Sequence, residues 1–262
     1  MIKFFRKIRH KLLTENKFSK YLIYAIGEII LVVIGILIAL QINNINEKSK
    51  SREREVNYLK NLKADLVSEI PNNEYFATYR FDKASACASL LNGKEPNSIK
   101  DVQNYTDTYE TVFVWNEYIP NNNTFKELLS SGNLSLIQND SIKNGLLELE
   151  KLYAGISTGE HHMRREYESY LYDPHVTKVM ALGFFDLSKP SYGFPDRLTA
   201  EAIPEELHKK MIDDARLQHN NDLFKNGLRL AQMNNGFLAG MHKNLVEYIK
   251  GLTVLIDKEI KK

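Results

Sequence analysis

The sequence of 262 residues has little of what catalytic and metal sites require. Its single cysteine, Cys87, excludes an intramolecular disulfide framework and a cysteine-based zinc site. The GxSxG elbow, the Walker loop, the dinucleotide glycine loop and the HExxH zinc-protease pattern are all missing from the sequence. Alternating apolar and polar runs of useful length are missing too, which argues against extensive β-structure. We therefore predict no catalytic, cofactor-binding or metal-ligating residue, and no enzyme.

The chain also has little excess charge, with a formal net charge of +2. The charge is unevenly placed: residues 1–20 hold seven Lys/Arg and one acid, whereas residues 43–262 hold 28 Lys/Arg and 31 Asp/Glu. Phosphate binding needs a concentrated positive face, and the body of the chain is mildly acidic. A nucleic-acid partner is therefore not expected.

What the sequence does contain is one long apolar run, YLIYAIGEIILVVIGILIALQI, at residues 21–42. A helix of this length spans roughly 33 Å, against about 30 Å of membrane hydrocarbon. The run is too long for the apolar region of a cleaved signal peptide, and no small-x-small cleavage site follows it. Its uniform apolarity argues against a buried core helix. We interpret it as a signal anchor, which makes the lipid bilayer the first expected partner.

The basic residues before the span set the expected orientation. Positive residues favour the cytoplasm, so residues 1–20 are predicted to be cytoplasmic and residues 43–262 to lie outside. Phe4, Ile8 and Leu12 recur at helical spacing opposite this charge, so the segment is either an amphipathic helix in the headgroup layer or a plain positive flank. The candidate membrane-surface residues are Lys3, Arg6, Lys7, Arg9 and Lys11.

One face of the span carries small residues that favour helix association. Gly27, Leu31, Gly35 and Ala39 are four residues apart, and small side chains let another helix approach closely. Glu28 lies beside this stripe, where an ionisable group should face protein or water and not lipid. Three interpretations of Glu28 stay open: a polar contact to another helix, a snorkelling or protonated side chain without a partner, and a proton-handling carboxylate.

The remaining residues predict an all-α body. Residues 43–70 read as a helical stalk that continues the span, and Pro71 is expected to kink or end it. Residues 71–262 are predicted to form one helical bundle. Its helices are expected over 98–119, from Asn123 or Thr124 to Ser131, from Asn139 or Asp140 to Tyr172, and over 205–260 as two helices or one bent helix.

Within this body, three features need an interpretation. The proline- and aromatic-rich residues 184–204 predict a loop, which either packs over the core or forms the lip of a binding site. His162 and Glu166 share a helix face, but the adjacent His161 points about 100° away, so solvated polar residues are expected there and not a metal. Cys87 is expected to be buried and inert. The expected buried stripe of the last helix is Leu230, Met233, Phe237, Met241, Leu245, Tyr248, Leu252 and Leu255.

Two stretches resemble a large family of single-pass membrane proteins of unknown function from Bacteroidota. They are MIKFFRKIRHKLLTENKFSKYLIYAIGEIILVVIGILIALQINN, at the N-terminus, and NNNTFKELLSSGNLSLIQNDSIKNGLLELEKLY, residues 121–153. The chain departs from the family in having Ile45 where a tryptophan is usual just beyond the span. The resemblance implies a Gram-negative cell envelope and its inner membrane, and it implies no known reaction.

Three hypotheses of function follow. The first is a non-enzymatic, membrane-anchored helical module of the bacterial inner membrane with a periplasmic body, acting by association with itself or with another envelope protein. The second is a ligand-sensing bundle with an apolar or aromatic pocket under residues 184–198. The third is an enzyme of unrecognised class, which would require a cleft that gathers His161, His162 and several carboxylates.

Overall fold

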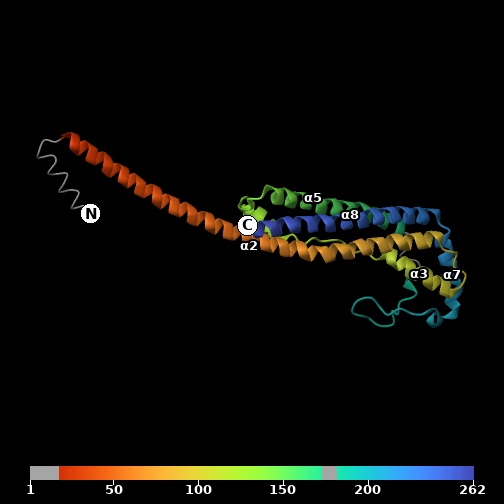
Figure 1. Ribbon diagram of the computed structural model, residues 1–262. Helices are drawn as coiled ribbons and strands as arrows, with labels where there is room; N and C mark the ends of the chain where they lie inside the picture. Colours follow the sequence, from red (N-terminus) through yellow and green to blue (C-terminus); the bar gives the residue numbers. More distant parts are fainter. Residues whose placement is uncertain (1–17, 173–181) are drawn as a thin grey trace. The chain divides into compact units, whose positions relative to one another are not determined.

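The computed structural model describes residues 18–172 and 182–262, and this part of the chain is helical (Figure 1). Among the described residues no strand is formed, and an isolated antiparallel bridge joins Phe185 and Arg197. The all-α fold class predicted from the sequence is therefore confirmed. The chain divides into two compact units, Met1–Asn57 and Tyr58–Lys262.

The first described helix, α2, runs without a break from Phe18 to Asn92. The predicted span and the predicted stalk, residues 21–42 and 43–70, are both parts of it. Pro71 lies inside the helix and does not end it. Pro71 and Val67, whose carbonyl loses its partner to the proline, are both exposed, so water can satisfy that carbonyl.

The C-terminal unit contains further helices, which follow α2 in the chain. In chain order these are α3 (Ile99–Phe113), α4 (Asn123–Ser130), the 3₁₀ turn η1 (Asn133–Leu136), α5 (Asp140–Tyr167), the π-helical turn η2 (Glu168–Tyr172), the 3₁₀ turn η3 (Ala200–Ala202), α7 (Glu205–His219) and α8 (Asp222–Ile260). The helix expected over 98–119 is confirmed as far as Phe113. Two helices, and not one bent helix, follow Pro204.

Local sequence explains where several of these helices begin and end. The Ser98 hydroxyl accepts a hydrogen bond from Asp101 N–H while the Asp101 carboxylate accepts from Ser98 N–H, which forms a capping box at the start of α3. Asn139 caps α5 as predicted, through its side-chain oxygen. Gly132 has φ +70°, the left-handed conformation expected after α4.

The start of α4 differs from the prediction. Its N-cap is Asn122, one residue before Asn123, and no side chain of its own caps it. The Asn122 amide instead donates to Glu150 at 2.6 Å, and Thr124 N–H is bound by the Asp65 carboxylate of α2 at 2.9 Å. A tertiary neighbour thus supplies the acceptor that a local cap would give.

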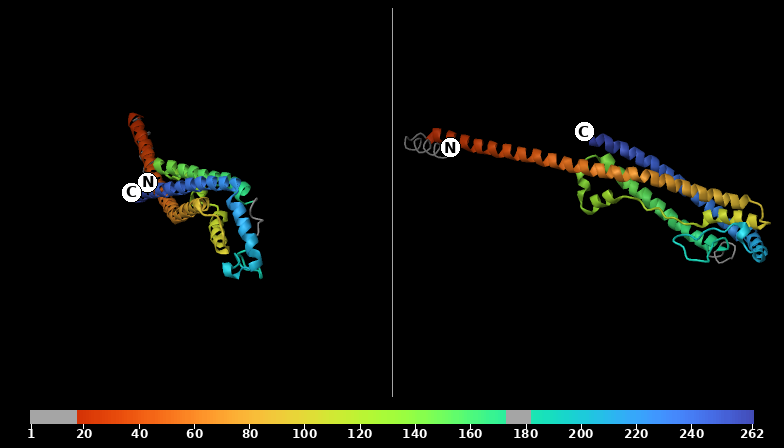
Figure 2. Two further views of the ribbon diagram at one scale, coloured as in Figure 1. Left: turned by 90° about the vertical axis from the view of Figure 1, so that its right-hand side faces the viewer. Right: turned by 90° about the horizontal axis from the view of Figure 1, so that it is seen from below.

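Three long helices form the bundle of the C-terminal unit: α5, α8 and the part of α2 from Tyr58 onward, which lie side by side (Figures 1 and 2). Their buried positions recur in steps of three and four, the heptad spacing of helices that pack along their length. On α2 they are Leu59, Leu62, Leu66, Glu69, Asn73, Phe76, Arg80, Lys83, Cys87 and Leu90; on α5 they are Ile142, Leu146, Leu149, Tyr153, Ile156, Glu160, Met163 and Tyr167; on α8 they are Phe224, Leu228, Ala231, Asn235, Leu238, His242, Leu245, Ile249, Leu252 and Ile256.

The α8 helix is antiparallel to α5. A β-carbon added at Gly145 would lie 2.8 Å from Leu252, and one added at Gly159 would lie 3.0 Å from Leu238. These two glycines therefore let the helices approach closely at both heights. α8 also runs antiparallel to α2, since Lys63 pairs with Asp257 at 2.7 Å and, further along α2, Asn73 lies 2.8 Å from His242.

The apolar core is divided into two clusters by a polar layer. One cluster spans Leu59–Phe76 of α2 and reaches Leu245–Ile256 of α8. The other begins at Ala86 of α2, includes α3 and α7, and ends at Ala231 of α8. Between and beside them lie buried polar residues of the three bundle helices, which we call the polar layer. They are Glu69, Asn73, Arg80, Lys83, Glu160, Asn235 and His242.

The buried stripe predicted for α8 is wrong at several positions. Met233 and Phe237 are each 68% exposed, because the buried register passes through Asn235 and His242 instead. The prediction followed the largest apolar residues of the helix, whereas the helix buries polar ones that have partners on α2. Of the other predicted members, the structure buries Leu245 and Leu252, half-buries Leu230, Met241 and Tyr248, and exposes Leu255.

Candidate functional site

The predicted helix-association residues all lie on α2, within the N-terminal unit. A β-carbon added at Gly27 or Gly35 would meet no atom within 4 Å, and Leu31 is 70% exposed. Ala39 is also exposed, and Glu28 is half-buried. The small residues thus face open space, and their association with another helix stays a prediction.

The apolar stretch around these residues is exposed. Its most apolar window has a mean hydropathy of 2.6 and no buried residue, and α2 is the one helix in the described part of the chain that is long and apolar enough to cross a membrane. A soluble protein's core helix would be mostly buried, so the core-helix alternative has no support. The exposed large side chains of this stretch are Leu22, Ile23, Ile26, Ile29, Ile30, Leu31, Val32, Val33, Ile34, Ile36, Leu37, Ile38, Leu40, Ile42 and Ile45.

The candidate membrane-surface residues Lys3, Arg6, Lys7, Arg9 and Lys11 lie outside the described residues. Their role therefore stays a prediction.

The histidines singled out in the sequence lie exposed on α5. His161 pairs with Glu117 at 3.4 Å, and His162 contacts Arg165 at 3.1 Å. The side chain of Glu166 lies outside the described residues. In the part of the chain that the structure describes, no three His, Cys, Asp or Glu side chains come together as metal ligands.

The centre of the polar layer is a buried ion pair. Arg80 of α2 and Glu160 of α5 are 0% and 1% exposed, and their closest atoms are 2.6 Å apart. Arg80 also donates to the Asn116 carbonyl at 2.9 Å and stacks over the Trp115 ring at 4.8 Å. Glu160 accepts in addition from Tyr118 N–H at 3.1 Å. Burial raises the pKa of Glu160, and the Arg80 charge opposes that rise.

Lys83 lies one turn further along α2, surrounded by aromatic rings. Its ammonium donates to the Val114 carbonyl and to the Tyr79 hydroxyl, the latter at 3.3 Å. The rings of Tyr79, Trp115 and Tyr167 lie within 5.2 to 5.5 Å of its nitrogen. Burial, helped by the nearby Arg80 charge, lowers the pKa of Lys83 to about 7.

A second series of polar contacts connects α2 with α8. The Tyr118 hydroxyl donates to the Glu69 carboxylate, and the Asn73 amide donates to both, at 3.1 Å to Glu69 and 3.0 Å to Tyr118. Asn73 Oδ1 lies 2.8 Å from His242 Nδ1. Burial lowers the pKa of His242 to about 4, so this histidine is neutral at pH 7 and its Nδ1–H donates to Asn73.

The polar layer holds a segment that has no helix of its own. Residues 114–121 form no regular secondary structure, so their backbone groups need partners outside the segment. Side chains of α2 and α5 bind them instead: Lys83 and Tyr79 at Val114, Arg80 at Asn116, Glu160 at Tyr118, and Glu69 at Asn121. The ionisable groups of the layer therefore act as backbone partners of this segment, which positions Trp115.

Sequence reasoning missed the polar layer, although a signal was present. The three-and-four spacing of Leu59, Leu62 and Leu66 continues directly through Glu69 and Asn73. Residue type alone favours Ile70 as the next buried position after Leu66, but Ile70 is only half-buried. Keeping the spacing and ignoring residue type would have found these polar positions.

Cys87 is fully buried in the second apolar cluster, as predicted. Burial raises the pKa of its thiol to about 12. A protonated thiol is a poor nucleophile, which agrees with the expectation of an inert side chain.

Next to this cluster, the end of α3 and the loop 182–197 enclose a hollow with a volume of about 230 Å³. We call it the apolar hollow. Of the aromatic residues in the predicted loop, Phe184 packs into the core, whereas Tyr192 and Phe194 are exposed. The residues that line the apolar hollow are Thr106, Tyr109, Glu110, Phe113, Val114, Leu182, Phe185, Leu187, Phe194, Pro195 and Arg197.

Comparison with known proteins places the chain by family alone. No curated protein and no solved structure matches it. Residues 28–185, which make up more than half of the chain, match the family of unknown function DUF6090. This match confirms the expectation of a family without an assigned activity, and it includes the 121–153 stretch. The chain therefore belongs to the family of unknown function DUF6090.

Proposed function

We propose that the protein is a non-enzymatic, membrane-anchored helical module of the bacterial inner membrane. The supporting observation is the exposed apolar stretch of α2. Fully burying one large apolar side chain contributes roughly 1.5–3 kcal/mol. The fifteen large apolar side chains of this stretch are about half exposed, which in water would cost on the order of 10–20 kcal/mol. A bilayer removes this cost.

The orientation proposed is a cytoplasmic N-terminus and a periplasmic C-terminal unit. The seven basic residues of 1–20 support it, because positive flanks are retained on the cytoplasmic side. Non-enzymatic action is supported by the polar layer, whose ionisable groups bind one another and the backbone of residues 114–121.

Anchoring is tested by carbonate extraction of membranes that contain the full chain with a reporter fused after Lys262. The protein should remain in the pellet, and a reporter that is active only outside the cytoplasm should be active. A matched variant, Val32→Arg, places a charge in the middle of the span and should release a large part of the protein. Extraction of the unaltered chain into the supernatant would refute the anchor, and an inactive reporter would refute the orientation.

The mode of action proposed is helix association in the membrane. Gly27, Gly35 and Ala39 allow a second helix to approach, and Glu28 can hydrogen-bond across the contact. The occupant of the contact is a second copy of the chain or another envelope protein.

Crosslinking in native membranes tests the association face. Gly35→Leu should lower the yield of crosslinked species several-fold, because the added side chain holds the helices apart. Val33→Phe is the control, since residue 33 lies about 200° around the helix from Gly35 and also gains several apolar carbon atoms. Equal yields from the two variants would contradict the association face.

A further inference from the structure

The apolar hollow is an uncovered and mostly apolar feature of the C-terminal unit. One wall is the C-terminal half of α3, with Phe113, and the other is the loop with Leu187 and Phe194. Leu187 is 67% exposed and Phe194 is 71% exposed. Apolar side chains gathered around a concave surface, and left open to water, are typical of a ligand site.

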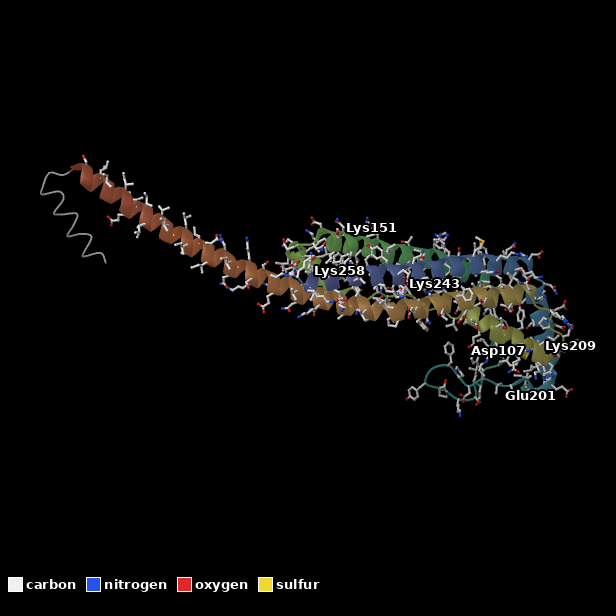
Figure 3. The ribbon with its side chains drawn as sticks, viewed as in Figure 1. Asp107, Lys151, Glu201, Lys209, Lys243 and Lys258 are labelled. Carbon is white, nitrogen blue, oxygen red and sulfur yellow. The ribbon has the colours of Figure 1, made fainter. Side chains whose placement is uncertain are left out.

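The loop is held in place at its base, so the hollow is a built feature. Asp186 N–H donates to the Asp196 carbonyl at 2.8 Å, and Leu198 N–H donates to the Phe184 carbonyl at 2.7 Å. Arg197 ties the loop to α3 through Glu110, at 2.6 Å, and through Asp107, which is labelled in Figure 3 beside the loop. The guanidinium of Arg197 also lies 4.9 Å from the centre of the Phe185 ring.

The volume sets the size of a ligand. A dry apolar cavity of about 150 Å³ holds benzene, with its six carbon atoms. The apolar hollow, at about 230 Å³, is therefore large enough for roughly nine or ten carbon atoms.

The charges set the kind of head group. The two charged residues among the lining side chains, Glu110 and Arg197, bind each other, and Asp107 adds a second carboxylate to the same guanidinium. This triad carries a net charge of −1 and offers no unpaired cation to an acid. A ligand with a carboxylate or phosphate head would be repelled.

We propose that the apolar hollow binds the alkyl chain of a neutral single-chain amphiphile, of the class of fatty alcohols and monoacylglycerols. The chain lies between Phe113 and the Phe185–Phe194 pair, whose rings stack 6.3 Å apart. The neutral head stays at the rim beside the Glu110–Arg197 pair. This site lies wholly within the C-terminal unit and does not depend on the anchoring proposed above.

The test is photolabelling of the full chain in lipid nanodiscs with a diazirine-bearing decanol. Peptide mapping should find label on residues 106–114 and 182–197, expressed as a fraction of all label on the chain. Leu187→Asp should lower the relative labelling of the hollow about tenfold or more, which corresponds to about 1.4 kcal/mol of binding free energy. Tyr192→Asp is the matched control, because Tyr192 is fully exposed on the same loop and does not line the hollow.

Both substituted side chains are exposed, so neither variant should lose its helical circular dichroism. Decanoate carrying the same diazirine, used at pH 8, should label the hollow more weakly than the alcohol. Label confined to the span, or an equal loss in both variants, would overturn the site. Equal labelling by alcohol and carboxylate would overturn the neutral head group.

Discussion

Replacing Lys83 with methionine should remove a pH dependence from the stability of the fold. Lys83 is 1% exposed, and its pKa falls from an ordinary 10.5 to about 7 because burial disfavours the ammonium. The groups that face it are Tyr79, Arg80 and Cys87 on α2, the Val114 carbonyl, and Tyr167 on α5. None of these is a carboxylate, so burial is not compensated by a direct ion pair.

The sign follows from counting protons. Between pH 7 and 10.5 the unfolded chain holds a proton on Lys83 that the folded chain has released, so stability rises with pH. Below pH 7 both states are protonated, and the folded state carries the full cost of a buried charge. One pKa unit is 1.36 kcal/mol, so raising the pH from 7 to 8.5 should stabilise the fold by about 1.5 kcal/mol at 25 °C.

Two other buried groups define the window in which this effect is isolated. The pKa of His242 falls from 6.5 to about 4, so its contribution rises with pH only up to about pH 6.5. The pKa of Cys87 rises from 9.0 to about 12, so its contribution falls with pH above about 9. Between pH 7 and 8.5 Lys83 therefore dominates.

The assay is urea unfolding of the detergent-solubilised full chain, followed by tryptophan fluorescence. Trp115 is the single tryptophan of the sequence, and its ring lies 5.2 Å from the Lys83 nitrogen, so the signal reports on this part of the bundle. The free energy of unfolding of the Lys83→Met variant should change by less than about 0.5 kcal/mol over the same pH range. Lys151→Met, on the exposed face of α5, is the control and should keep the full slope. A slope that survives in Lys83→Met would refute the assignment.

Three further predictions concern the core. Glu160→Ala should lower the free energy of unfolding by about 3–5 kcal/mol, because it leaves Arg80 buried without its partner. Glu168→Ala, which removes an exposed ion pair, should lower it by less than about 1 kcal/mol. Equal losses in urea titrations would argue against the buried pair. Cys87 should react with a maleimide only when urea unfolds the chain, and rapid labelling of the folded chain would contradict its burial. Leu238→Ala should lower the free energy of unfolding by about 2–5 kcal/mol, whereas Phe237→Ala should lower it by less than about 0.5 kcal/mol. A larger drop in melting temperature for Phe237→Ala than for Leu238→Ala would contradict the buried register of α8.

Most of the helices could be predicted from the sequence because their signals are local. A capping asparagine at Asn139 and a left-handed glycine at Gly132 depend on residues a few positions away. The absence of alternating runs indicated an all-α chain, and the proline-rich residues 184–204 indicated the loop. Pro71 was less informative, because its effect depends on whether the freed carbonyl of Val67 faces water.

The apolar hollow could be anticipated in position but not in form. Aromatic residues in a proline-rich loop suggested either packing or a binding lip, and the structure contains both, with Phe184 buried and Phe194 exposed. The partners that fix the loop base, Asp107 and Glu110 with Arg197, are about ninety residues apart in sequence. Their pairing could not be inferred from local spacing.

The sequence by itself determined that the chain is helical and that residues 21–42 form a helix apolar on every side, because both follow from composition and periodicity. Only the tertiary structure decided that the buried face of each bundle helix includes polar residues. A side chain such as Arg80 or His242 is excluded from a core by its own polarity and admitted by a partner on another helix, and in this chain those partners, Glu160 and Asn73, lie 80 and 169 residues away.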